Sequence, residues 1–121
     1  MERRTLFILG GLVALGLIGW IRSGPPDMKA VRRAAGDEPV VMISASWCGY
    51  CKSLRENFKT WGVRYVELDI DKDPAGRRVY SLAQARGVPV VLVGERIFHG
   101  YDPGSIHQAI VDAGLQPETT P

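Results

Sequence analysis

The chain has 121 residues, 45% hydrophobic and 23% charged, which suits one globular domain and excludes a fully disordered chain. Its two cysteines are too few for a disulfide-stapled scaffold or a four-cysteine zinc site. Six basic and two acidic residues give +4 over residues 1–36, whereas nine basic and eleven acidic residues give −2 over residues 37–121. The weakly acidic body is a poor candidate for binding nucleic-acid phosphates.

The run from Thr5 to Ile21 contains seventeen residues without a charge. At about 1.5 Å per residue, a helix over 5–21 reaches about 25 Å, the short end of a membrane span. Trp20 suits the headgroup zone, and Arg22 follows the run. We therefore expect residues 1–22 to form a single-pass membrane anchor. A cleaved signal peptide is the alternative, although Trp20, Ile21 and Arg22 stand where cleavage requires small residues.

The charges on the two sides of this run bear on its orientation. Arg3, Arg4 and the α-amino group favour an N-terminus on the cytoplasmic side, whereas Arg22 and Arg32 favour the reverse. A lone N-terminal anchor usually exports the domain behind it. We expect the following domain on the extracytoplasmic (periplasmic) face, with the cytoplasmic face as the alternative.

Residues 23–38 are expected to form a linker that contains one short helix. Pro25 and Pro26 interrupt the preceding helix. Asp27 is suited to cap a helix that runs to Ala35 and stops at Gly36.

The next three elements are predicted to be a strand, a helix and a strand. Pro39–Ala45 is a short valine-rich run typical of a buried strand. One helix face then follows at spacings of three, four and three, formed by Cys51, Leu54, Phe58 and Trp61. Gly62 ends this helix, and Val63–Ile70 carries the β-branched and aromatic residues of a second strand.

A second helix and a hairpin are predicted next. Asp73 and Pro74 are typical of a cap and a first helical position, and we expect the helix to stop near Gly87. Its inward residues are expected to be Val79, Leu82 and Ala83. Pro89–Val93 is a third strand, and the tight connection Gly94-Glu95 pairs it with a fourth strand, Arg96–Phe98.

The last helix is predicted after Asp102-Pro103, with Gly114 as its stop. Its inward face is expected to hold Ile106, Ala109, Ile110 and Ala113. The order β-α-β-α-β-β-α predicts an α/β domain over residues 39–114, with a mixed four-stranded sheet flanked by helices. Residues 115–121 are expected to form a disordered tail.

The segment Cys48-Gly49-Tyr50-Cys51 lies between the first strand and the first helix of this domain. At a helix start, unpaired backbone N–H groups and the helix dipole stabilise a thiolate, and such settings lower a cysteine pKa to roughly 3.5–7.5. Cys51 is one turn further along the same helix face. Cys48 is therefore predicted to attack a disulfide, and Cys51 to resolve the mixed disulfide that forms.

The cysteine pair has two other interpretations. A zinc site would need His99 and His107 as further ligands, but these histidines are eight residues apart, whereas paired zinc ligands are commonly three to five apart. A structural disulfide would tie together nothing distant, because its two cysteines share one helical turn. No metal site is predicted.

The segment from Ser46 to Lys52 (SWCGYCK) resembles the active site of the thioredoxin superfamily, and Val88-Pro89 resembles its second hallmark. Within the superfamily, residues 39–113 are most similar to glutaredoxins. The resemblance implies a thioredoxin-like (glutaredoxin-like) fold, a redox-active disulfide between Cys48 and Cys51, and a cis peptide bond before Pro89.

The resemblance also implies a surface that binds substrate or glutathione. In glutaredoxins the backbone before the cis-proline pairs with an extended substrate or with glutathione, and the start of the last helix holds its γ-glutamyl end. Carried onto this chain, the residues of that surface are Trp47, Tyr50, Val88, Pro89, Gly100, Tyr101 and Asp102.

This chain departs from the glutaredoxin pattern at several positions. Ala45 stands where a lysine that attracts the glycine carboxylate of glutathione is common. Met42 stands where thioredoxins bury an aspartate, and Gly87 and His99 replace a usual threonine and a second glycine. The reductant is therefore either glutathione or a thioredoxin-reductase-type donor.

We expect a membrane-tethered, monomeric thiol–disulfide oxidoreductase that reduces protein or glutathione mixed disulfides, with glutathione as co-substrate and no bound cofactor. One alternative is a redoxin that binds a [2Fe–2S] cluster through glutathione, which anaerobic purification would reveal by colour. Another is an exported disulfide oxidase or isomerase, whose potential would lie near about −120 to −180 mV.

Overall fold

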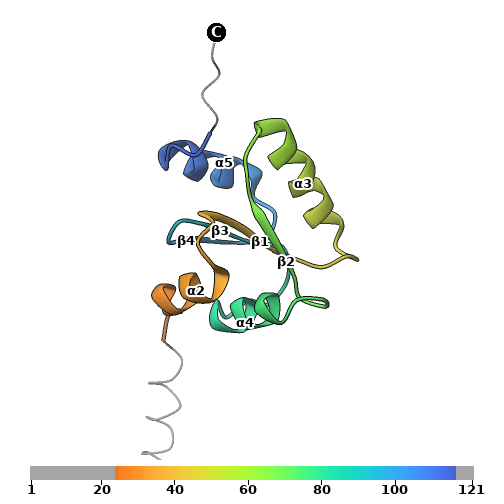
Figure 1. Ribbon diagram of the computed structural model, residues 1–121. Coiled ribbons are helices and arrows are strands. Elements are labelled where there is room, and N and C mark those ends of the chain that lie inside the picture. Colours follow the sequence, from red (N-terminus) through yellow and green to blue (C-terminus); the bar gives the residue numbers. More distant parts are fainter. Residues whose placement is uncertain (1–23, 117–121) are drawn as a thin grey trace, which may run out of the picture.

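A four-stranded sheet lies between two layers of helices in the computed structural model, which describes residues 24–116 (Figure 1). The expected transmembrane helix at 5–21 lies outside the described residues, as do residues 117–121 of the expected tail. Among the helices of residues 24–116, none has both the length and the apolar character needed to cross a membrane.

The sheet has the strand order β2-β1-β3-β4 and is mixed, as expected. β1 (Val40–Ser44) pairs in parallel with β2 (Val66–Asp69) and antiparallel with β3 (Val90–Val93). β4 (Arg96–His99) pairs antiparallel with β3 and forms the other edge. The two central strands are buried along their whole length because helices cover both faces of the sheet.

Two helices cover each face of the sheet (Figure 1). One face packs against α3 (Gly49–Trp61) and α5 (Pro103–Asp112). The other face packs against α2 (Met28–Ala35) and α4 (Pro74–Leu82). Alternate residues of the central strands therefore enter two separate cores.

Helix α2 belongs to the folded body, although its residues were expected to form a linker. The expected helix itself is confirmed: Asp27 accepts hydrogen bonds from the N–H groups of Lys29 and Ala30, and Gly36 ends the helix at a φ of 92°. Val31 and Ala35 are buried in the same core as α4. The described fold thus begins near residue 28 rather than at residue 39.

Helix α4 ends at Leu82, earlier than the stop expected near Gly87. Gln84 adopts a left-handed conformation with a φ of 55°, which ends the helix as a glycine usually does. The side-chain amide of Gln84 donates to the carbonyl oxygen of Gly24 at 2.9 Å. Asp73 holds the expected cap position, but its carboxylate accepts the N–H of Asp69 at 2.9 Å instead of a helix N–H.

Two expectations for the C-terminal end were wrong. Ala113 is exposed, since it lies beyond the last turn of α5. Leu115 was assigned to the tail but packs against the core that contains Ile110. The N–H of Leu115 donates to the carbonyl of Ile110 at 3.0 Å, and Gly114 before it has a φ of 67°. Helices that end at a left-handed glycine often have this hydrogen bond together with an apolar contact from the next residue.

A close approach of α4 to β2 makes Gly76 intolerant of a side chain. A Cβ at Gly76 would lie 2.9 Å from the carbonyl oxygen of Asp69. We expect Gly76→Ala to lower the free energy of unfolding by about 1–3 kcal/mol, because the backbone of β2 must shift. Urea unfolding measures this loss.

The control is Gly104→Ala in α5. A Cβ added at Gly104 has no atom within 4 Å, so this substitution should be neutral or slightly stabilising. Equal effects of both substitutions would contradict this packing.

Candidate functional site

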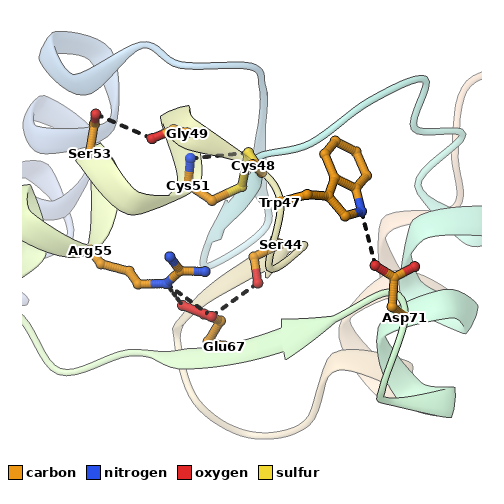
Figure 2. Close-up of a disulfide and its surroundings, with 9 residues drawn as sticks. All are labelled: Ser44, Trp47, Cys48, Gly49, Cys51, Ser53, Arg55, Glu67 and Asp71. Carbon is orange, nitrogen blue, oxygen red and sulfur yellow. Dashed lines mark hydrogen bonds and ion pairs between the residues drawn. A yellow bond between two sulfur atoms is a disulfide. The ribbon is translucent and has the colours of Figure 1, made fainter.

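The two cysteines form a disulfide at the first turn of α3 (Figure 2). Cys48 is the N-cap residue of the helix, and its Sγ accepts the N–H of Cys51 at 3.1 Å. Cys48 is 7% exposed and Cys51 is completely buried. The strand β1 ends at Ser44, and the turn from β1 into α3 places Cys48 nearer the surface than Cys51.

The loop before β3 packs directly on this disulfide. The peptide bond between Val88 and Pro89 is cis, as the resemblance implied. Val88 packs against a small apolar cluster that consists of Ala45, Cys48 and Cys51. Among the described residues, the backbone N–H and C=O of Val88 form no hydrogen bond, so both are available to a bound chain.

Trp47 lies beside the disulfide with 71% of its surface exposed. Its indole N–H donates to Oδ2 of Asp71 at 3.0 Å, which fixes the ring next to Cys48 (Figure 2). Asp71 belongs to an acidic turn that no sequence signal connects with Trp47. In the same turn, the Asp69 carboxylate accepts the N–H groups of Asp71 and Lys72, so it fixes the backbone that carries Asp71.

Tyr50 and Tyr101 stack on each other across the site, with ring centroids 5.3 Å apart and an angle of 21° between the rings. They are 64% and 39% exposed, so the pair forms an apolar patch open to solvent. Gly100 has a φ of 88°, which favours glycine, and its N–H donates to the carbonyl of Pro89 at 2.9 Å. This bond joins the cis-proline loop to the segment that carries Tyr101.

A shallow hollow of about 430 Å³ lies next to the cis-proline loop. It is lined by Gln84, Arg86, Gly87, Val88, His99 and Gly100. Asp102 caps α5, since its Oδ1 accepts the N–H of Ser105 at 3.2 Å. The structure therefore brings the cis-proline loop, Trp47 and the stacked tyrosines close to the disulfide.

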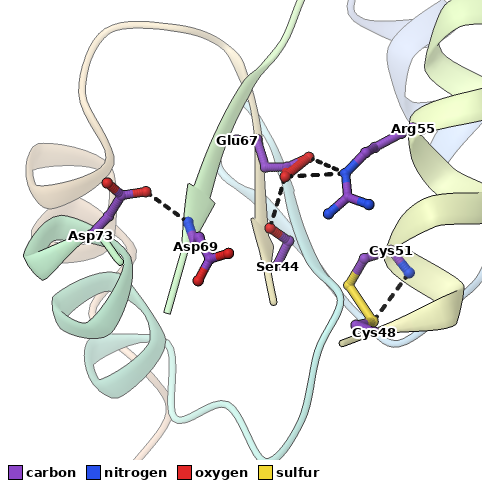
Figure 3. Close-up of polar contacts among 7 residues, drawn as sticks. All are labelled: Ser44, Cys48, Cys51, Arg55, Glu67, Asp69 and Asp73. Carbon is purple, nitrogen blue, oxygen red and sulfur yellow. Dashed lines mark hydrogen bonds and ion pairs between the residues drawn. A yellow bond between two sulfur atoms is a disulfide. The ribbon is translucent and has the colours of Figure 1, made fainter. Parts of the chain in front are cut away.

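A polar network on the far side of the disulfide was not predicted (Figure 3). Arg55, one turn after Cys51, places its Nε 2.6 Å from Oε1 of Glu67. Ser44 is buried and its hydroxyl donates to Oε2 of Glu67 at 3.1 Å. The hydrogen bond to Glu67 raises the pKa of Arg55. The network ties α3 to β1 and β2 beneath the cysteine pair.

The two histidines considered as metal ligands have other surroundings. The ring of His107 packs on Trp61, with ring centroids 4.6 Å apart. His99 lies at the rim of the shallow hollow beside Gly100. Within residues 24–116, no group of three or more His, Cys, Asp or Glu side chains is arranged to hold a metal ion.

Tyr65 gives the fold a pH dependence at the alkaline end. Burial raises the pKa of Tyr65 above its ordinary value of 10.0, and the Glu67 carboxylate adds to the rise. The folded chain then holds the phenol proton more tightly than the unfolded chain. This contribution to stability is complete below about pH 10 and is lost as pH rises through the raised pKa.

We therefore expect Tyr65→Phe to flatten the loss of stability above about pH 10. Urea midpoints of the wild type and the variant, measured from neutral to alkaline pH, check this expectation. If the two curves remain parallel over the whole range, Tyr65 does not titrate as described.

The chain is similar in sequence and in fold to known glutaredoxins. A family model described as Glutaredoxin matches residues 40–98, from the start of β1 into β4. Glutaredoxin-C11 of Arabidopsis thaliana is 30% identical over 98 residues, which cover 71% of this chain and 95% of the relative. A glutaredoxin structure from Archaeoglobus fulgidus shares 30% identity, with a TM-score of 0.55 over 64% of this chain and 91% of that chain. The buckwheat glutaredoxin–glutathione complex shares the fold at 23% identity, with a TM-score of 0.57 over 74% and 88% of the two chains.

Proposed function

Because this chain belongs to the glutaredoxin family and is a thiol–disulfide oxidoreductase, we propose that it reduces protein disulfides or glutathione mixed disulfides. The observation that carries the proposal is the disulfide at the first turn of α3, with the cis-proline loop packed against it.

The reaction begins with the reduced dithiol. The Cys48 thiolate attacks one sulfur of the substrate disulfide, the substrate S–S bond breaks, and the leaving sulfur takes a proton from water. Cys51 then loses its proton and attacks the sulfur of Cys48, which releases the second substrate thiol. Two electrons have passed to the substrate, and the enzyme is left with the Cys48–Cys51 disulfide. The greater exposure of Cys48 supports its role as the attacking cysteine.

Substrate binding is assigned to the surface around the disulfide. The free N–H and C=O of Val88 are suited to pair with an extended peptide or with glutathione in the manner of an added strand. The stacked Tyr50 and Tyr101 offer an apolar wall beside it. The N-terminal turn of α5, at Asp102, is suited to a ligand that carries both an amino group and a carboxylate.

The reductant is proposed to be glutathione, with a thioredoxin-reductase-type donor as the second candidate. Two glutathione molecules return the disulfide to the dithiol and leave as glutathione disulfide. The buckwheat glutaredoxin of the same fold was crystallised as a glutathione complex, which supports the first candidate. Ala45, which is buried and uncharged, favours the second, because no cation stands there to attract a glutathione carboxylate.

A coupled assay separates these two donors. The full chain in detergent is mixed with a glutathionylated peptide as disulfide substrate, glutathione, glutathione reductase and NADPH. A parallel reaction contains the same peptide with thioredoxin reductase and NADPH. We expect NADPH to be consumed in the glutathione reaction and not by Cys48→Ser. Turnover with thioredoxin reductase alone would assign the second donor. Turnover in neither reaction would contradict the proposed disulfide reductase.

We propose further that the apolar run at 5–21 anchors the enzyme in a membrane, with the catalytic domain on the extracytoplasmic face and the chain acting as a monomer. The length of the run and its flanking arginines support the anchor. A reporter enzyme fused to the C-terminus, active on one side of the membrane only, tests the orientation.

A further inference from the structure

A groove lies between α2 and α4. These two helices cover the face of the sheet opposite α3 and α5 (Figure 1). Its volume is about 700 Å³, and small apolar residues form much of its wall: Ala30, Ala34, Ala75 and Leu82. Arg33 from α2 and Arg78 from α4 also line it. None of these residues takes part in the proposed disulfide chemistry.

The groove carries positive charge that the described fold does not neutralise. Helices α2 and α4 together contain five Lys and Arg residues and no Asp or Glu. Arg33 and Arg78 are exposed, and neither takes part in an ion pair or side-chain hydrogen bond within residues 24–116. Asp27 and Asp73, at the starts of the two helices, accept backbone N–H groups. The groove is therefore suited to an anionic ligand.

The position of α2 in the chain indicates where such a ligand would be found. The apolar run ends at Ile21 and α2 begins at Met28, so six residues connect them. Even fully extended, this connector reaches about 25 Å. If the proposed membrane anchor holds, α2 lies close to the bilayer surface, where anionic headgroups attract basic residues.

We propose that the groove between α2 and α4 binds the headgroup phosphate of an anionic membrane phospholipid, so that this face of the domain rests on the bilayer. Arg33 and Arg78 would bind the phosphate oxygens, a pairing in which guanidinium groups donate two parallel hydrogen bonds. The apolar wall would accommodate the glycerol part of the lipid. The cysteine pair on α3 belongs to the opposite layer and stays accessible to soluble disulfides.

The test uses the full chain in nanodiscs of phosphatidylcholine, with or without phosphatidylglycerol, and measures amide hydrogen exchange. We expect exchange in α2 and α4 to be slower in the anionic discs, and the difference to vanish at high salt. A basic residue near an anionic surface strengthens binding about fivefold, so Arg33→Gln with Arg78→Gln should weaken docking about 25-fold. The matched control, Lys59→Gln with Arg96→Gln, removes the same charge from other surfaces and should keep the protection.

Each outcome separates this inference from the proposed anchor. Incorporation into the discs with equal exchange in both lipids would overturn the docking face and leave the anchor intact. Protection lost equally in the control variant would show general charge attraction and overturn the groove. A chain that does not enter the discs at all would overturn the anchor, and the docking face with it.

Discussion

Replacing Cys48 with serine is expected to lower turnover of a glutathionylated peptide by roughly 10³-fold or more, because the attacking sulfur is lost. The serine hydroxyl is not ionised near neutral pH and is a poor nucleophile toward sulfur. The fold should survive, since serine is close to cysteine in size and is itself a good N-cap residue. Steady-state kinetics with the glutathione-coupled assay measure the loss.

Cys51→Ser is the matched variant, because it removes the other sulfur of the same disulfide. It should retain a large part of the activity on glutathione mixed disulfides, where a second glutathione can resolve the adduct on Cys48. It should lose activity on protein disulfides that need the internal attack by Cys51. Equal loss in both variants on the glutathionylated peptide would contradict the assignment of the two roles.

Phe58→Ala is expected to produce a large loss of stability, about 3–5 kcal/mol. The Phe58 ring is fully buried between α3 and the sheet, with Tyr65 at 4.5 Å and Trp61 at 5.8 Å between ring centroids. Its removal leaves a cavity that these larger neighbours cannot easily fill. Because a domain of this size is stable by only about 5–15 kcal/mol, the variant should unfold at clearly lower urea concentration.

Phe98→Ala is the control variant, because it also removes a phenyl ring but from a less buried position. Phe98 lies on the edge strand β4 and is only partly buried, so its ring keeps contact with solvent in the folded state. Its removal should cost clearly less than the removal of Phe58. Equal losses at the two positions would contradict the placement of Phe58 at the centre of this core.

The elements with local end signals were predictable from the sequence. Three helices begin and end near the residues expected from the sequence. The start and stop residues are Asp27 and Gly36 for α2, Cys48 and Gly62 for α3, and Asp102 and Gly114 for α5. Each signal acts within a few residues, where a cap or a left-handed glycine fixes the backbone. The spacing of the two cysteines and the helix start likewise depend on neighbouring residues alone.

Features that depend on distant residues were not predictable. Helix α4 ends at a left-handed Gln84 whose side chain bonds to Gly24, sixty positions away. The packing of α2 into a core depends on α4, which follows it by about a third of the chain. In a single sequence, nothing about Gln84 or about α2 indicates which distant residues they will contact.

In the candidate site too, features set by neighbouring residues were predictable and contacts between distant residues were not. Cys48 and Cys51 were predicted from their motif, but the partner of Trp47, Asp71, comes from the turn after β2. The network of Ser44, Arg55 and Glu67 joins three elements, and only the folded sheet brings its members together. A polar residue in a buried strand, here Ser44, was the one available hint that a partner would be found.

Two single-cysteine variants would show directly where disulfide exchange begins. Cys51→Ser and Cys48→Ser are each reduced, mixed with glutathione disulfide, quenched with acid at increasing times and examined by peptide mass mapping. We predict that Cys51→Ser acquires glutathione on Cys48 quickly and completely, whereas Cys48→Ser acquires it on the buried Cys51 far more slowly. Equal rates in the two variants, or no adduct on Cys48, would contradict Cys48 as the attacking thiol.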